Sequence, residues 1–401
     1  MADNYDSKKI KVPDFELEGR CSNLQREMEP TGLDAVLVLQ QADKFYFSGT
    51  VQNGVLFVPS RGKPVFMVRK SLERAREESS IEYIVPFKSY KEMPEILKKH
   101  GYSRFQTIGL ELDVMPYLIY SKLKSVFPET ELMEASGIIR KIRMRKSQYE
   151  LDMMRKAGAI LAKAMRAVPD IMREGMTEIE VAAETEIILR KAGHQGIIRM
   201  RKWNQECFYG LILSGESGAI SNYMDAPLGG VGPCPAAPRG ASWKKIGKNE
   251  PVIIDMVSAY NGYVVDCTRT FHLGRLDDRL QKAFDVSLEI QETVLDMFRS
   301  GVNLRAVYDV AVSMASKAGL GPHFMGYGKG QARFIGHGVG LELDELPVIA
   351  KGYDFTLEDG MTVAIEPKFM FPKIGAVGVE NTWAAGKGAA EKISDLEDVI
   401  S

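Results

Sequence analysis

The sequence predicts a mixed α/β (α+β) protein of two domains, residues 1–138 and 139–401. Its 401 residues are too many for one ordinary hydrophobic core, so two domains are expected. Short apolar runs typical of strands alternate with helix-like stretches from residue 21 to about residue 135. After residue 146, helix-capping signals and an internal repeat predict a larger second domain built from two similar halves.

The first domain is expected to contain a β-hairpin and three helices. Apolar residues 55–58 and 65–68 flank a polar turn with a proline at each end, a pattern typical of a hairpin. A further strand-like run covers residues 35–39, and helix-like stretches follow at residues 72–78, 93–100 and 117–126. The acidic and basic residues of this domain are scattered, and no chemistry is predicted in it.

Two capping boxes mark the start of the second domain, after a basic connector at residues 139–146. Ser147 with Glu150, and Thr177 with Glu180, have the spacing at which each side chain caps the other residue's backbone N–H. They predict two consecutive helices, the first ending before Pro169.

An internal repeat suggests that these helices have counterparts 126 residues further on. Gly175 and Gly193 stand 18 residues apart, as do Gly301 and Gly319. Each pair encloses an N-cap residue and an amphipathic helix, and a long helix is expected before each. Helix caps look alike in many proteins, but the equal spacing favours two pseudo-symmetric halves.

Composition and charge exclude several classes of protein. The net charge of −1 provides no field that would attract nucleic acid or an anionic membrane, and neither partner is expected. No apolar run approaches the ~20 residues that span a bilayer. The N-terminus is polar and lacks the apolar segment of a signal peptide, so a cytoplasmic protein is expected. None of the four cysteines forms a CxxC pair, which fits a reducing compartment.

Two aspartates lie on a predicted hairpin. Asn261-Gly262 is the strongest short hairpin signal, and it separates two β-rich runs. If these are the two loop residues, Asp255 faces Thr268, and Asp266 shares a face with Asp255 as its diagonal neighbour. Diagonal neighbours are about 7–8 Å apart, close enough to share ions. They could be surface aspartates, but both follow apolar residues, and a buried carboxylate needs a partner or a metal.

Two glutamates flank a second predicted hairpin. Lys373 is midway between Glu366 and Glu380, so a turn centred there places the glutamates opposite each other, with Cβ atoms about 4.5–5.5 Å apart. Carboxylates at that distance repel unless a cation lies between them.

One histidine completes the set. His337 stands between Gly336 and Gly338, which allow a close backbone approach and a tight turn. A lone histidine in such a turn is usually structural, but the four strand-borne carboxylates favour a metal ligand. Four carboxylates and one imidazole suit two divalent metal ions, Mn, Fe, Co or Zn. Two such ions can activate a water and polarise a carbonyl.

At these residues the sequence resembles the metallopeptidase family of methionine aminopeptidase, prolidase, aminopeptidase P and creatinase. The family's five metal ligands match, in order, Asp255, Asp266, His337, Glu366 and Glu380. The match is strong over about residues 140–390 and weaker over 15–135, which resemble the creatinase-type N-terminal domain.

The resemblance implies a pita-bread fold, in agreement with the internal repeat. It also implies a dinuclear hydrolase, nominally an Xaa-Pro peptidase, that uses a metal-bridging hydroxide. Glu366 would be both metal ligand and proton shuttle. A homodimer is commonly found in the family.

Two residues depart from the family pattern. Asn222 and Asp344 stand where the peptidases usually carry histidines that contact the substrate and the tetrahedral intermediate. Asn222 can still donate a hydrogen bond, whereas an ionised Asp344 cannot. Asp344 could therefore disfavour an anionic group and accept a cation, or it could pair with a nearby Lys or Arg. We treat both residues as candidate substrate-binding residues, and Asp344 as a candidate acid or base.

These departures keep other functions open. The alternative enzyme is a hydrolase or lyase of the same fold that acts on a small non-peptide, possibly cationic, substrate. A catalytically silent binding module is disfavoured, because it would not need five metal-binding side chains. Creatinase activity is disfavoured because creatinase lacks the metals.

Two segments near Asn222 have no assigned role. The Gly/Pro-rich residues 225–243 are either a surface loop or a wall or lid over the site. A polar-aromatic stretch before them could grip a substrate carboxylate or pair on the surface; it contains Arg199, Arg201, Trp203 and Asn204.

Overall fold

The computed structural model describes residues 10–221 and 223–399, which form two compact units. The chain passes from one to the other between Arg143 and Met144. The expected boundary after residue 138 falls inside helix α6 (Ser136–Met144). Most of the expected basic connector at residues 139–146 lies in this amphipathic helix, and the division between the two units falls within the connector.

The first unit is a six-stranded mixed sheet with helices, in the strand order β4-β3-β2-β1-β5-β6. The predicted hairpin is confirmed as β2 and β3, which pair antiparallel. The strands and helices of this unit are β1 (Ala35–Val38), β2 (Gly54–Pro59), β3 (Val65–Val68), β4 (Tyr83–Pro86), β5 (Thr107–Leu110), β6 (Glu131–Glu134), α1 (Asp14–Met28), α2 (Gln41–Ser48), α3 (Leu72–Glu78), α4 (Met93–Lys99) and α5 (Tyr117–Val126).

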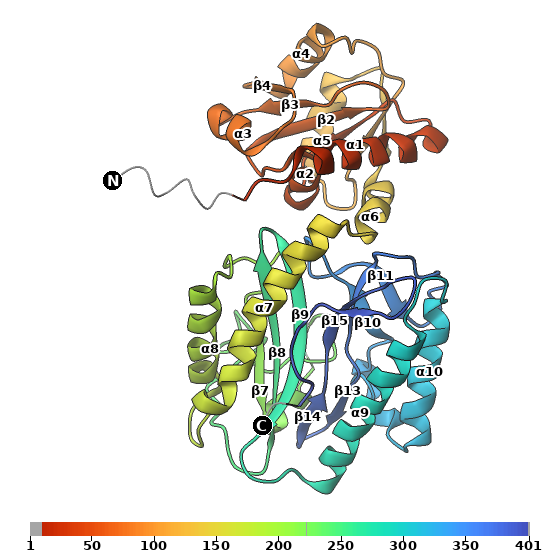
Figure 1. Cartoon of the computed structure of the whole chain (residues 1–401). Helices are drawn as coiled ribbons and strands as arrows, with labels where there is room; N and C mark the ends of the chain where they lie inside the picture. The colour runs from red at the N-terminus through yellow and green to blue at the C-terminus, as the bar shows by residue number, and fades with distance from the viewer. Residues whose placement is uncertain (1–9, 222, 400–401) are drawn as a thin grey trace. The chain divides into compact units, whose positions relative to one another are not determined.

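The first half of the second unit is a three-stranded sheet covered by two helices (Figure 1). Its elements are α7 (Gln148–Ile171), α8 (Glu178–Ala192), β7 (Gly210–Ser214), β8 (Pro251–Tyr260) and β9 (Tyr263–His272). Helix α7 packs on β8 and β9, and α8 packs on α7 and β7. The predicted β8–β9 register is confirmed: Tyr260 pairs with Tyr263, and Asn261 and Gly262 both have positive φ.

The second half has its own helix pair, α9 (Asp278–Met297) and α10 (Leu304–Lys317), on the opposite side of the unit (Figure 1). Its main sheet has the order β11-β10-β12-β15-β16. The strands are β10 (Phe334–Gly338), β11 (Glu345–Ala350), β12 (Thr362–Ile365), β15 (Asn381–Ala384) and β16 (Glu391–Lys392), with a separate hairpin of β13 (Lys368–Phe371) and β14 (Gly375–Gly378).

The helix pairs explain the internal repeat. Both predicted capping boxes are present, at the starts of α7 and α8, and Gly193 ends α8 in the left-handed conformation. Helix α7 continues two residues past Pro169, which corrects the predicted end, and Val168 is fully buried there. Of the helices in residues 10–221 and 223–399, none has the length and apolarity needed to cross a lipid bilayer.

A buried arginine joins the two halves beside the carboxylates. Arg269 on β9 is 1% exposed, and its guanidinium donates to the carbonyls of Thr268 (2.7 Å) and Glu380 (2.8 Å). It also donates to the carbonyls of Leu396 and Glu397 near the end of the described chain. A single side chain thus fixes strand β9, the Glu380 backbone and the C-terminal segment together.

Removing this guanidinium should be strongly destabilising. Arg269→Leu removes the hydrogen bonds that this buried guanidinium donates to both halves and to the C-terminal segment, and we expect the free energy of unfolding to fall by about 3–5 kcal/mol. Denaturant unfolding measures the change. The control is Arg275→Ala, which breaks an exposed pair with Asp278 and should cost less than about 1 kcal/mol. Equal losses in the two variants would contradict the account.

Candidate metal centre

The first half contributes two carboxylates from its central hairpin. Asp255 on β8 pairs with Thr268 on β9, and Asp266 lies two residues before Thr268, as the turn predicts. Thr268 in turn forms an isolated bridge with Glu380 of the second half. The threonine hydroxyl donates to Oε2 of Glu380 at 2.7 Å. One row across the sheet therefore connects Asp255, Thr268 and Glu380.

The two glutamates lie just beyond the paired residues of the β13–β14 hairpin. Lys368 pairs with Gly378, and Lys373 at the tip has a φ of 64°, which fits a turn centred there. Beyond this pair the same register continues, since Ile365 on β12 pairs with Asn381 on β15. The N–H of Glu366 donates to Ile335, and that of Glu380 donates to Thr268. Glu366 and Glu380 therefore lie opposite each other, as the turn at Lys373 predicts, while their backbone N–H groups bond to other strands.

His337 lies in strand β10 rather than in the tight turn expected from its glycines. The glycines are needed for close packing instead. A Cβ on Gly336 would lie 2.5 Å from the Ala364 carbonyl, and one on Gly338 would lie 2.4 Å from the Leu346 carbonyl. Any side chain at these positions would push the neighbouring strands away from His337.

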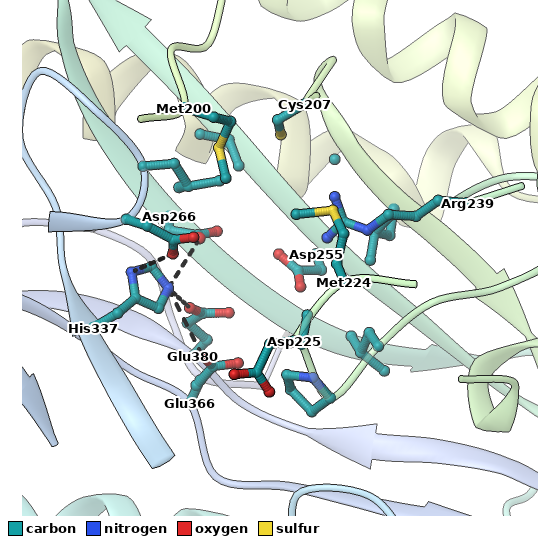
Figure 2. Close-up of a pocket in the computed structure, with 18 of the residues that line it drawn as sticks. Met200, Cys207, Met224, Asp225, Arg239, Asp255, Asp266, His337, Glu366 and Glu380 are labelled. Atoms are coloured by element: carbon teal, nitrogen blue, oxygen red, sulfur yellow. Dashed lines mark ion pairs between the residues drawn. The ribbon is translucent and has the colours of Figure 1, made fainter. Parts of the chain in front are cut away.

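The imidazole of His337 faces three of the carboxylates (Figure 2). Its Nε2 lies 3.8 Å from Oδ2 of Asp266, 3.7 Å from Oε1 of Glu366 and 3.9 Å from Oε1 of Glu380. Its Nδ1 donates to the Gly338 carbonyl at 3.2 Å. That hydrogen bond leaves the Nε2 lone pair free to bind a cation, the usual arrangement of a metal-binding histidine.

The electrostatics of the cluster fit a divalent cation. Among the described residues, Oδ1 of Asp266 and Oε1 of Glu380 are buried without a hydrogen-bond donor. Ligand atoms of Asp266, His337 and Glu380 all lie within 4.8 Å of one another. Atoms bound to one ion at about 2.0–2.2 Å would be roughly 3–4.4 Å apart, so a small contraction suffices.

Burial and mutual repulsion perturb the acidities in this cluster. Burial raises the pKa of Asp266 well above its usual value, and the neighbouring Glu380 and Asp255 raise it further. Burial also raises the pKa of Glu380 to about 7, although Lys368 opposes the shift. For His337, burial lowers the pKa, but Asp344, Glu366 and Glu380 outweigh it and the net shift is upward.

A pocket opens beside these residues, and the Gly/Pro-rich segment forms part of its wall. Met224, Asp225 and Arg239 line it, together with Met200 and Cys207 (Figure 2). This segment therefore borders the pocket near its beginning, at Asp225, and near its end, at Arg239. Residues 233–237 between them are exposed. Burial raises the pKa of the Cys207 thiol to about 12, so it is not an activated nucleophile.

Of the two residues that depart from the family pattern, the structure describes only Asp344. Asn222 lies outside the described residues. Asp344 lines the pocket, its side chain is 28% exposed, and its Oδ1 is 3.6 Å from Nδ1 of His337. It therefore adds negative charge beside the imidazole.

The residues of the polar-aromatic stretch 199–204 have different environments. Arg201 is buried, and its Nη1 lies 3.5 Å from Oε2 of Glu342, while Trp203 is 86% exposed. From this stretch Met200, which the sequence did not single out, lines the pocket.

The sequence did not predict that a lysine belongs to this cluster. Lys368 on β13 is 1% exposed, and its Nζ lies 2.7 Å from Oε2 of Glu380, 2.8 Å from Oε2 of Glu366 and 3.2 Å from Oδ2 of Asp255. Burial lowers its pKa, but the carboxylates outweigh this and raise it well above the usual value, so it remains an ammonium. The available signal was a lysine at the start of the otherwise apolar run KFMF, two residues after Glu366.

Comparison with known proteins identifies the family. Residues 152–387 match metallopeptidase family M24, and residues 20–145 match the creatinase/prolidase N-terminal domain. The chain belongs to metallopeptidase family M24, which confirms the resemblance and the fold class predicted from the sequence.

Its relatives match along almost their whole length. An Xaa-Pro dipeptidase from Pyrococcus furiosus is 27% identical over 95% of this chain and 99% of its own. The prolidase structure from Pyrococcus horikoshii is 26% identical, with a TM-score of 0.80 over 96% of this chain and 100% of its own. An Xaa-Pro dipeptidase structure from Bacillus anthracis is 25% identical, with a TM-score of 0.82 over 96% and 99%.

The raised pKa of Glu380 predicts an inverted pH dependence of stability in chelator. The pKa is about 7 in the folded chain and 4.5 ordinarily, so the native state binds more protons between these values. The free energy of unfolding should therefore fall as the pH rises from about 4.5 to 7, with about 3 kcal/mol coming from Glu380.

Denaturant unfolding at pH 5 and pH 8 in chelator measures this effect. Glu380→Gln should flatten the profile, whereas the exposed Glu184→Gln should leave it unchanged. If the unmodified protein gains stability over this range and Glu380→Gln does not alter the slope, the assignment is wrong.

Proposed function

We propose that this protein is a metal-dependent Xaa-Pro peptidase. The observation that carries the proposal is the convergence of Asp266, His337 and Glu380, with Glu366 and Asp255 beside them, at the base of a pocket. The relatives named Xaa-Pro dipeptidase support the substrate class.

In this proposal the metal ligands are drawn from these five residues. The family resemblance implies two divalent ions, and the mixture of carboxylate and imidazole suits Mn, Fe, Co or Zn. When bound, such an ion lowers the pKa of a water and polarises the scissile carbonyl. His337 is oriented for this role by its hydrogen bond to Gly338, and Arg269 holds the Glu380 backbone in place.

The proton transfers are assigned to Glu366. Its carboxylate lies at the base of the pocket, with Oε1 towards His337 and Oε2 on Lys368. Held there, it can take a proton from the attacking water and return it to the leaving proline nitrogen. The wall at residues 224–228 would limit access of water and of long substrates, which favours small peptides.

The location and assembly are proposed with the activity. The cysteine content, without a CxxC pair, supports a cytoplasmic protein, and the family resemblance supports a homodimer. We also propose residues 1–138 and 139–401 as the creatinase-type and catalytic domains. Light scattering on the purified chain tests the dimer, since a monomer at micromolar concentration would contradict it.

A substitution at Glu366 tests the mechanism. Glu366→Gln keeps the shape of the side chain but removes the base, so kcat on an Xaa-Pro dipeptide should fall at least ~10²-fold. Steady-state kinetics in Mn²⁺ are measured together with the metal content of the variant. Turnover close to normal with metal still bound would refute the role of Glu366.

One observation favours the alternative substrate class, a small cationic molecule. Asp344 and Asp225 both line the pocket, and Asp344 stands where a histidine is expected. A carboxylate there disfavours an anion and stabilises an amine, guanidinium or sulfonium group. Simple Xaa-Pro dipeptides would then be weak substrates in comparison.

The charge at Asp344 can be tested with matched substrates. We expect Arg-Pro or Lys-Pro to be cleaved with about 5–10-fold higher kcat/KM than Leu-Pro, equivalent to roughly 1 kcal/mol. Asp344→Asn should remove this preference, and Asp344→His should raise activity on Leu-Pro. The exposed Asp296→Asn is the control. A preference that survives Asp344→Asn would show that Asp344 does not select the substrate.

A further inference from the structure

Lys368 occupies the space between three of the proposed metal ligands. Its ammonium contacts Oδ2 of Asp255, Oε2 of Glu366 and Oε2 of Glu380 at 2.7–3.2 Å. Charge-assisted hydrogen bonds have this length, and an ammonium has three protons to donate. Each of its protons therefore has a carboxylate acceptor, so the cation is fully satisfied where it lies.

The carboxylate oxygens divide between two cation positions. Glu366 and Glu380 direct Oε2 to Lys368 and Oε1 to the side of His337. Asp266 adds its Oδ2 on the histidine side, and Asp255 adds its Oδ2 on the lysine side. One position is thus surrounded by an imidazole and three carboxylate oxygens, and the other is filled by an ammonium.

The backbone makes room for the lysine. Lys368 pairs with Gly378 across the β13–β14 hairpin. A Cβ on Gly378 would lie 2.8 Å from both Cα and Cγ of Lys368, closer than carbon atoms pack. The glycine therefore lets the aliphatic part of Lys368 pass over the neighbouring strand toward the carboxylates. The position of the lysine is thus built into the pairing of β13 with β14.

A second divalent ion would lie next to the ammonium of Lys368. With Lys368 present, the four carboxylates and one divalent ion leave one net negative charge, whereas a second ion would add two positive charges beside the ammonium. It would also have to share Asp255, Glu366 and Glu380 with an ammonium in contact with all three. Like charges a few ångströms apart inside a protein cost several kcal/mol.

We propose that Lys368 takes the place of one of the two family metal ions, so that this chain binds a single divalent ion on the side of His337. The inference rests on the proposed function for the ion itself. Asp266, His337, Glu366 and Glu380 hold that ion, and Asp255 serves chiefly as a counter-ion to Lys368.

Metal stoichiometry tests the inference directly. The full-length protein, stripped with chelator, is dialysed against excess Mn²⁺, and bound manganese per chain is measured. We expect one ion in the unmodified protein and two in Lys368→Ala, because that variant frees three carboxylates and the space between them. The matched control is Lys373→Gly, an exposed lysine at the tip of the same hairpin, which should still bind one.

A measurement on the unmodified protein covers the case in which Lys368→Ala does not fold. Two neighbouring Mn²⁺ ions couple magnetically and give a multiline electron paramagnetic resonance spectrum, whereas one ion gives six isolated lines. Six lines up to one equivalent, with only free Mn²⁺ signal added beyond it, support the proposal. A coupled spectrum, two bound ions per chain, or no bound ion overturns it.

The two proposals fail in different ways. Two bound ions together with Xaa-Pro cleavage would leave the peptidase intact and remove the role of Lys368. One bound ion without Xaa-Pro cleavage would leave the role of Lys368 intact and remove the substrate class.

Discussion

Four carboxylates are gathered in a space from which water is largely excluded, and every other feature of the catalytic unit must accommodate their repulsion. Asp266, Glu366 and Glu380 are each at most 5% exposed, so solvent cannot screen them. Ionised groups so placed require cations, or they take up protons instead. Lys368 is such a cation, in contact with Glu380. The raised pKa values of Asp266 and Glu380 show that these two carboxylates also tend to take up protons. A divalent ion beside His337 would neutralise most of the remaining charge.

The two-halved fold is what brings these groups together. One half supplies Asp255 and Asp266 from a regular hairpin. The other supplies His337 from β10, whose pairing with β11 is irregular, and Glu366 and Glu380 from positions directly after β12 and directly before β15. Their meeting depends on the bridge between Thr268 and Glu380 and on the guanidinium of Arg269 beneath it. Neither half holds a complete site, so the interface between the halves must remain ordered for any cation to be bound.

The sequence predicts local features better than the contents of the site. The Asn261-Gly262 turn defines the register of the aspartate hairpin, because a two-residue turn leaves a single pairing. The same reasoning places the second turn at Lys373 and Glu366 opposite Glu380, because the flanking pairs Ile365–Asn381 and Lys368–Gly378 share one register. Lys368 and the pocket residue Arg239 could not be predicted from spacing. Their positions depend on tertiary contacts, and a lone lysine in a strand is ordinarily exposed.

The central claim is that a resident ammonium and one metal ion share the carboxylates. Anomalous diffraction from crystals soaked in Mn²⁺, recorded at the manganese edge, tests it most directly. The account predicts one anomalous peak per chain, about 2.2 Å from Nε2 of His337 and bonded to Asp266 and Glu380, with Lys368 still against Asp255. Two peaks a few ångströms apart, with the lysine displaced from the cluster, would contradict it.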